Sequence, residues 1–213
     1  MAKILITSGP TRQYLDPVRY LTNASSGKMG CALAAAALEL GHAVVLVSGP
    51  VEISYPPRAR VISVISTEEM LAAALAEFPA CDGLIGVAAP CDYRPQQVAP
   101  HKIRKTGEPL ELHLIETPDI VATLCGQKRA DQWAVGFALE TEDARFRAVV
   151  KLQKKSCDLM VANGPQAMNS PDNQVEILDR GGEVIAALQG NKSLVARQIL
   201  HVIEERLIRP AAG

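Results

Sequence analysis

The chain alternates short apolar runs with amphipathic helix patterns, and this alternation constrains its fold more than any other feature. Six runs rich in Val, Ile and Leu lie at 3–8, 43–49, 60–66, 83–90, 133–139 and 157–163. Runs that are apolar on both faces are typical of strands buried inside a parallel sheet. Helical patterns separate several of them, at 27–41, 67–78 and 141–155. The order predicts an α/β fold with a doubly wound, mostly parallel, Rossmann-like sheet.

The helix ends and the C-terminal part of the chain carry further signals. Gly41 is placed to end the first helix, and Thr67 and Thr141 are candidate N-caps of the next two. The segment 174–188 has the pattern of a β-hairpin with Gly181 and Gly182 at its turn, and an amphipathic helix is predicted over 191–206. We therefore expect one domain over 1–206 and a frayed tail over 207–213.

Composition excludes several classes of protein. The 22 basic and 23 acidic side chains give a formal net charge of -1, which provides no electrostatic basis for binding nucleic acid or an anionic membrane. No apolar run reaches the ~18 residues of a membrane span, and the first residues enter a strand pattern without the features of a signal peptide. We therefore expect a cytoplasmic protein.

The five cysteines are scattered and show no spacing typical of a metal site. We expect most of them to be small core residues in a reducing compartment. Cys91 is the exception to watch, because it lies beside a polar motif.

Polar stretches follow five of the predicted strands, at 8–12, 48–50, 89–95, 139–141 and 163–165. Because ligands in open α/β sheets bind at the carboxyl ends of the strands, we expect a site there. The segment TNASSGKMG at 22–30 opens a helix but matches neither a Walker A loop nor GxGxxG. It is open to two interpretations: a plain N-cap, or an anion site built from free helix N–H groups.

Individual side chains in these stretches also have two interpretations each. Asn23 is either a turn residue or a donor to a carbonyl group, and Asp92 either caps a turn or binds hydroxyl or amide groups. Lys102, Arg104 and Lys105 lie in a long segment without core patterning, 90–118, and form either a lid over phosphates or a solvated basic loop.

In combination these segments resemble the phosphopantothenate–cysteine ligase family, the synthetase half of the bacterial bifunctional coenzyme A biosynthesis protein. ILITSGPTRQYLDPVRYLTNASSGKMG is similar to the family signature, AAPCDYRP to AAVADYRP, HKIRK to KIKK, TPDIVA to NPDIVA and GFALET to GFAAET. KLQKKSCDLMVAN resembles the following K-L-x-x-K…A-N run, so the likeness covers roughly residues 3–206 in order.

The resemblance implies coenzyme A biosynthesis by ligation of 4′-phosphopantothenate to L-cysteine. The carboxylate attacks the α-phosphate of CTP, with Mg²⁺, to give an acyl-cytidylate and pyrophosphate, and the cysteine amine then displaces CMP. The domain over 1–206 would be a nucleotide-binding ligase domain, cytoplasmic and homodimeric. No decarboxylase half is present in the sequence, so no flavin is expected, and a separate decarboxylase protein is a candidate partner.

The resemblance also assigns roles to residues. Asn23 and Lys102 would be catalytic, Asn23 by holding the acyl carbonyl and Lys102 by acting on the α-phosphate. Substrate would be bound by Asn23, Ala88, Ala89 and Asp92, with Arg19 reaching across a dimer interface. Nucleotide would be bound by Gly9, Ser25, Ser26, Gly27, Gly30, Asp92, Lys102, Pro118, Asp119, Ile120, Val121, Phe137, Lys151, Lys155 and Asn163.

The sequence departs from the family pattern at three places. Gln13 stands where Glu is frequent, Pro90 and Cys91 replace Val-Ala, and Asn163 is followed by Gly-Pro where Asp is common. Pro90 puts the local geometry in question because it fixes φ and lacks a donor.

Three other functions are compatible with parts of the pattern. The same ligation driven by ATP is one, because the family includes an ATP-preferring branch. A NAD(P)-dependent Rossmann oxidoreductase would need GxGxxG after the first strand and an acidic residue ending the second, and SGPTRQ and VSGPVE provide neither. A non-catalytic nucleotide-binding module would need neither Asn23 nor the lysine loop.

Overall fold

A single eight-stranded sheet forms the centre of the molecule. The computed structural model describes residues 1–139, 143–163 and 172–208. The strands follow the order β5-β4-β1-β6-β9-β10-β11-β12 across the sheet. Six parallel strands are β1 (Lys3–Ser8), β4 (Ala43–Ser48), β5 (Arg60–Ser63), β6 (Gly83–Gly86), β9 (Trp133–Leu139) and β10 (Leu159–Asn163). Two antiparallel strands, β11 (Asp172–Asp179) and β12 (Val184–Asn191), complete one edge. The predicted fold class is confirmed.

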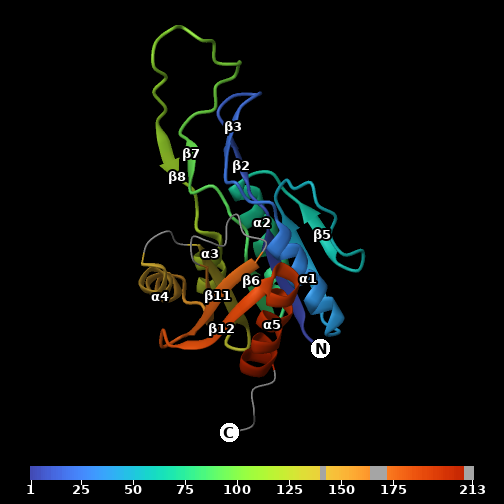
Figure 1. Cartoon of the computed structure of the whole chain (residues 1–213). Coiled ribbons are helices and arrows are strands. Elements are labelled where there is room, and N and C mark those ends of the chain that lie inside the picture. The colour runs from blue at the N-terminus through green and yellow to red at the C-terminus, as the bar shows by residue number, and fades with distance from the viewer. Residues whose placement is uncertain (140–142, 164–171, 209–213) are drawn as a thin grey trace.

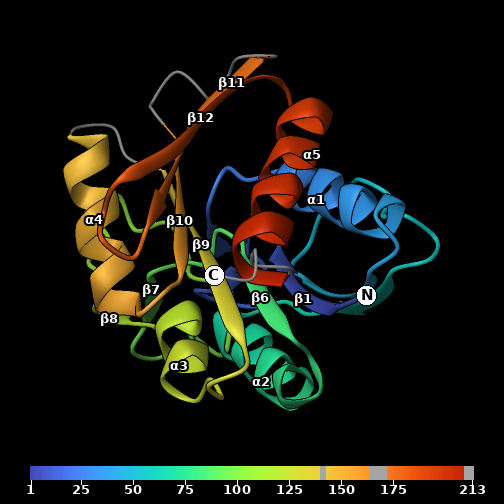
Figure 2. The ribbon, with the colours of Figure 1, turned by 90° about the horizontal axis from the view of Figure 1, so that it is seen from below.

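Helices cover both faces of the sheet, as the two-sided apolar runs require. On one face α1 (Lys28–Glu39) packs against α5 (Lys192–Ile203); on the other lie α2 (Thr67–Glu77), α3 (Ile120–Gly126) and α4 (Ala144–Lys155). Figure 2 shows the sheet between these two layers. Successive residues of β1 alternate between them: Ile4 and Ile6 pack under α1, and Leu5 packs under α2. All three are fully buried.

Several predicted boundaries need correction. The N-cap of α2 is Ser66, whose hydroxyl accepts from the Glu69 N–H, whereas Thr67 is buried and its hydroxyl is bonded to Thr11. Helical structure continues past 206 in a π-helical turn (Glu204–Ile208), because Leu207 and Ile208 pack against the core. The runs at 60–66 and 83–90 end as strands at Ser63 and Gly86. The Thr141 cap and residues 209–213 lie outside the described residues.

The predicted C-terminal hairpin is confirmed. Its turn holds Gly182 at φ 82°, and the Gly182 N–H donates to the Asp179 carbonyl. Of the helices in the described ranges, none has the length and apolarity needed to cross a bilayer.

Two short hairpins that the sequence did not predict project beyond the sheet. One pairs β2 (Arg12–Tyr14) with β3 (Tyr20–Thr22), and the other pairs β7 (Tyr93–Pro95) with β8 (Leu114–Glu116). They lie side by side, with β2 against β7, and Figure 1 shows them standing above the sheet, opposite the N-terminus. We call the residues 12–22 and 93–116 the arm. The segment 90–118 is therefore not one long loop but a hairpin with a loop at its tip.

Candidate functional site

The order of strands changes direction at β1, which has β4 on one side and β6 on the other. Such a reversal is where open α/β sheets bind ligands, because the loops after the two central strands separate there. Here the loops are held together: the Ala89 N–H donates to the Gly9 carbonyl at 2.9 Å, and the Cys91 N–H donates to the Thr11 hydroxyl at 2.8 Å. The two loops thus meet at the carboxyl edge of the sheet, beside the base of the arm, where the sequence predicts a site.

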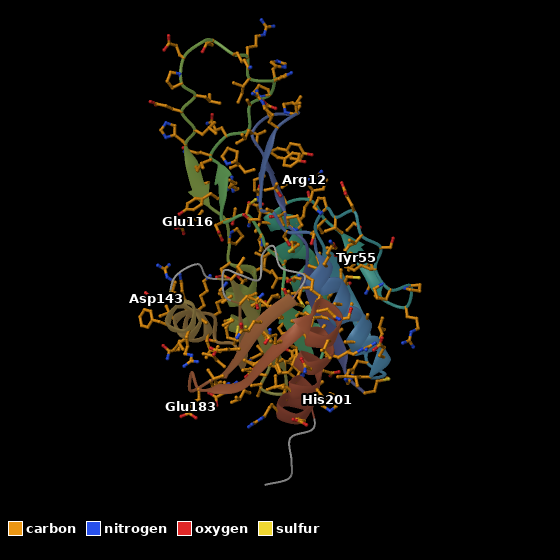
Figure 3. The ribbon with its side chains drawn as sticks, viewed as in Figure 1. Arg12, Tyr55, Glu116, Asp143, Glu183 and His201 are labelled. Atoms are coloured by element: carbon orange, nitrogen blue, oxygen red, sulfur yellow. The ribbon has the colours of Figure 1, made fainter. Side chains whose placement is uncertain are left out.

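A pocket of about 260 Å³ opens beside the contact between these two loops, between the loop after β6 and the start of α3. Eight predicted site residues line it: Ala88, Asp92, Pro118, Asp119, Ile120, Val121, Phe137 and Lys155. The pocket is also lined by residues that the sequence did not point to, including Thr7, Tyr93, Glu116, Thr117 and Lys154. Figure 3 shows Glu116 at the base of the arm.

Asp119 organises the floor of the pocket. One carboxylate oxygen accepts from the Ala122 N–H at 3.0 Å and caps α3, and the Lys155 ammonium donates to both oxygens at 2.9 and 2.8 Å. Burial by itself raises the pKa of this carboxyl, but the bonds from Lys155 and Ala122 outweigh it and hold the pKa below the ordinary value of 3.8. Lys155 is therefore fixed in the pocket as the partner of a charged Asp119.

The first turn of α1 presents unpaired backbone donors. Its N-cap is Gly27, at φ 72°, with no side chain bonded to the helix end, and the first intrahelical bond runs from the Cys31 N–H to the Gly27 carbonyl. Next to this end, Ser25 is half-buried and Ser26 is exposed, and neither side chain caps it. No side chain of the described residues caps this end, and a helix N-terminus with uncapped N–H groups favours an anion.

Two glycines let α1 start directly against the strand ends. A Cβ on Gly30 would lie 2.1 Å from the Ser8 Oγ, so only glycine permits this contact between helix and strand. Gly9 has φ 73° and lies against Val51. Tyr55, which the sequence did not point to, lies beneath the same turn and donates to the Ser8 hydroxyl at 3.0 Å; Figure 3 shows it on the α1 side of the molecule.

Asn23 connects the α1 side of the site to the pocket side. Its amide nitrogen donates to the Ala89 carbonyl at 3.1 Å and to the Pro90 carbonyl at 2.8 Å. Both amide hydrogens are used within the chain, so contact with an acyl carbonyl would require one of them to exchange partners. Asn23 thus bonds the segment before α1 to the loop after β6. Neither turn chemistry nor sequence spacing predicted this contact.

The residues that depart from the family pattern are accommodated by local contacts. Cys91 is buried and its thiol donates to the carbonyls of Thr11 and Leu21, while burial raises the pKa of the thiol. It is a packing residue rather than an activated nucleophile. Pro90 lacks an N–H, but its contact to Asn23 is made by its carbonyl, which a proline retains. Gln13 is buried and donates to the Glu68 carboxylate at 2.8 Å, where a glutamate would bring a second negative charge.

Other predicted site residues lie outside the pocket lining. On α4, Lys154 lines the pocket and Lys151 does not. Asn163 ends β10 with a buried Oδ1 that has no partner among the described residues, and the Gly-Pro that follows it lies outside them. Lys102 is exposed on the arm, and Arg19 pairs with Asp16 within the same chain.

The described ranges contain no group of three or more His, Cys, Asp or Glu side chains placed to hold a metal ion. Of the five cysteines, four are buried and Cys31 is half-buried, which confirms the expectation that most are core residues.

The Asp119–Lys155 pair predicts a pH dependence of stability. A carboxyl whose folded pKa is depressed stabilises the fold above its ordinary pKa, and this contribution is lost as the pH falls through the folded value. Asp119→Asn retains a capping side chain but not the charge. We expect it to cost about 0.5–1 kcal/mol in the free energy of unfolding at pH 7, and progressively less below about pH 4. Urea unfolding across this range measures it. Lys155→Gln should show the same trend, and a pH-independent difference would contradict the assignment.

Comparison with known proteins is consistent with this geometry. The family model described as DNA/pantothenate metabolism flavoprotein C-terminal domain matches residues 1–207. The coenzyme A biosynthesis bifunctional protein CoaBC of Vibrio parahaemolyticus is 43% identical over 197 residues, covering 90% of this chain and 49% of the relative. That of Escherichia coli K12 is 41% identical over 210 residues, covering 95% and 52%. The chain spans about half the length of these curated relatives.

Solved structures show the same fold. A C-terminal domain of the coenzyme A biosynthesis bifunctional protein CoaBC superposes with a TM-score of 0.81 at 37% identity, covering 98% of this chain and 96% of that one. The DNA/pantothenate metabolism flavoprotein from Streptococcus pneumoniae superposes with a TM-score of 0.83 at 22% identity, covering 97% and 100%. Sequence and structure together show that the chain belongs to the family of DNA/pantothenate metabolism flavoprotein C-terminal domains.

Proposed function

We propose that the chain ligates 4′-phosphopantothenate to L-cysteine in coenzyme A biosynthesis, using CTP, with release of pyrophosphate and then CMP. The observation that carries the proposal is that two candidate binding regions meet where the loops after β1 and β6 are bonded to each other. The uncapped start of α1 favours an anion, the pocket at α3 is lined by charged as well as apolar side chains, and Asn23 bonds the two sides together.

This arrangement suits a reaction driven by positioning and charge stabilisation. Activation of a carboxylate on a nucleotide needs cations and N–H donors around phosphate groups, and amide formation needs the acyl carbonyl held while an amine attacks. Neither step needs a nucleophilic side chain. The buried Cys91, with its raised pKa, is consistent with that requirement.

The proposed nucleotide contacts divide between the two sides. On the α1 side they are the first-turn N–H groups with Gly9, Ser25, Ser26, Gly27 and Gly30. On the pocket side they are Asp92, Phe137, Lys155 and residues 118–121, with Lys151 and Asn163 nearby. Ala88, Ala89 and Arg19 are proposed to meet the phosphopantothenate, and Lys102 to approach the α-phosphate.

Mg²⁺ is proposed as the partner of the triphosphate. This ion keeps several waters and is commonly bound by one or two carboxylates together with substrate phosphates. Asp92 and Glu116 both line the pocket and are exposed, so they fit such a role. Bound there, Mg²⁺ would neutralise phosphate charge.

We also propose that two copies associate through the arm. Eight large apolar side chains are exposed on it: Val18, Tyr20, Tyr93, Val98, Leu110, Leu112, Leu114 and Ile115. Exposed apolar side chains gathered on one projection favour an interface. Light scattering on the purified chain should give twice the chain mass.

A separate decarboxylase is a further candidate partner, since the curated relatives are bifunctional proteins and the chain spans about half of them.

The connection between β1 and α1 argues against a dinucleotide oxidoreductase. In that class a short glycine-rich turn joins the first strand to the first helix. Here the residues between Ser8 and Lys28 form the β2–β3 hairpin of the arm before the helix begins. The chain keeps the helix N-terminus that the dinucleotide-binding class also uses, but the segment before it forms a hairpin and contacts the loop after β6.

Pyrophosphate release tests the proposed reaction. The chain is expected to form pyrophosphate only when 4′-phosphopantothenate is present, and fastest with CTP among CTP, ATP, GTP and UTP. A faster reaction with ATP would assign the function to ATP-driven ligation, and equal rates with all four would remove the nucleotide preference. Pyrophosphate formation without phosphopantothenate, or hydride transfer to NAD, would contradict the ligase assignment.

Lys102 and Lys105 provide a matched comparison within one loop. Both are exposed, so Lys102→Gln and Lys105→Gln should each change the free energy of unfolding by less than ~0.5 kcal/mol. A lysine is a mobile point charge, suited to following phosphate charge as it moves to the leaving group. We expect Lys102→Gln to remove most pyrophosphate release in a single turnover, and Lys105→Gln to reduce it less. Equal losses, explained entirely by weaker nucleotide binding, would show a general electrostatic role for the loop.

A further inference from the structure

Asp16 is a fully buried carboxylate on a part of the molecule that projects into solvent. It lies in the turn between β2 and β3, and its side chain has an exposed fraction of 0%. One oxygen accepts from the backbone N–H groups of Val18 at 2.8 Å and Arg19 at 2.9 Å. The other accepts from the Arg19 guanidinium at 2.6 and 2.9 Å and from the Ile103 N–H at 3.1 Å. A buried charge persists only when it is paired and hydrogen-bonded in this way.

The contact to Ile103 reaches across the arm to the segment that carries Lys102. Arg19 donates from the same guanidinium to the Ile103 carbonyl at 2.6 Å, so both backbone polar groups of Ile103 are held. A further bond, from the Ala99 N–H to the Leu15 carbonyl, attaches the segment four residues earlier. We call Asp16, Arg19 and Ile103 the Ile103 clamp. It fixes the backbone one residue from Lys102 and leaves the side chains of Lys102, Arg104 and Lys105 exposed.

We infer that Asp16 is a positioning residue for the ligation, holding Ile103 through the clamp and thereby setting the place from which Lys102 reaches the nucleotide. This inference rests on the proposed function of Lys102. A loop anchored beside its reactive side chain keeps that side chain within a small volume, whereas an unanchored loop spreads it over many positions. Loss of the clamp should therefore lower the rate of the first step more than it weakens nucleotide binding.

Cleavage by trypsin detects the clamp without relying on the ligase activity of the chain. The bonds after Lys102, Arg104 and Lys105 are trypsin sites next to the clamped residue. Asp16→Asn keeps the shape of the side chain but removes the charge that strengthens its bonds to Arg19 and Ile103, so cleavage at 102–105 should rise by about tenfold or more. Asp131→Asn is the matched control, because Asp131 also pairs with an arginine, Arg129, but is exposed and lies outside the arm. Its cleavage at 102–105 should equal that of the wild type.

Arg19→Gln is the second variant if Asp16→Asn does not fold, as judged by circular dichroism. It removes the guanidinium contacts to Asp16 and Ile103 and leaves the backbone partners of Asp16 in place. Faster cleavage at 102–105 is expected here too. A folded Asp16 or Arg19 variant with cleavage at the wild-type rate would overturn the clamp.

A double-mutant cycle tests whether Asp16 acts through Lys102. Single-turnover pyrophosphate release is measured in the wild type, Asp16→Asn, Lys102→Gln and the double variant. If the clamp acts through Lys102, Asp16→Asn should slow release about tenfold or more in the wild-type background and less than about twofold in the Lys102→Gln background. Equal losses in both backgrounds would overturn the positioning role. A wild-type chain that releases no pyrophosphate would overturn the proposed function, while the trypsin comparison would still decide whether the clamp exists.

Discussion

The site depends on one contact, the bonding of the loop after β1 to the loop after β6. The strand order makes these loops neighbours. A backbone bond from the Ala89 N–H to the Gly9 carbonyl and a bond from the Cys91 N–H to the Thr11 hydroxyl hold them together. Cys91 completes the contact because its small thiol is buried against the carbonyls of Thr11 and Leu21. The amide of Asn23 then reaches across to the same loop. Residues separated by more than sixty positions in sequence therefore meet at one place at the carboxyl edge of the sheet.

The arm leaves the sheet at this corner and separates β1 from α1 along the chain. The β2–β3 hairpin lies between β1 and α1, so the chain passes through the arm before it returns to start the helix at Gly27. The β7–β8 hairpin leaves the loop after β6 and returns at Thr117, whose N–H and hydroxyl bond to the carbonyls of Asp92 and Cys91. Both hairpins are thus anchored at the pocket, and Lys102 is carried on the structure that borders it.

Sequence reasoning succeeded where the information was local. Two-sided apolar runs predict buried parallel strands, and Gly181 with Gly182 predicts the turn of the C-terminal hairpin, whereas the short helix α3 was not predicted. It failed where a distant partner decides the outcome. The three-residue strands of the arm have no pattern of their own, Thr67 loses the capping role because Thr11 binds its hydroxyl, and the burial of Asp16 depends on Ile103. The resemblance pointed to Lys151 and Lys155, but it did not show that Lys154, rather than Lys151, lines the pocket beside Lys155.

Asn23 joins the two sides of the site, and we propose that an activated acyl group is held between them. The most direct measurement is a quenched single turnover of Asn23→Asp with CTP, phosphopantothenate and cysteine, following pyrophosphate and amide product separately. A carboxylate at this position cannot donate to a carbonyl, and losing such a donor typically costs ~3–4 kcal/mol. We expect amide formation to fall by ~10² to 10³ while nucleotide binding and pyrophosphate release persist. Amide formation at a near-normal rate would contradict it.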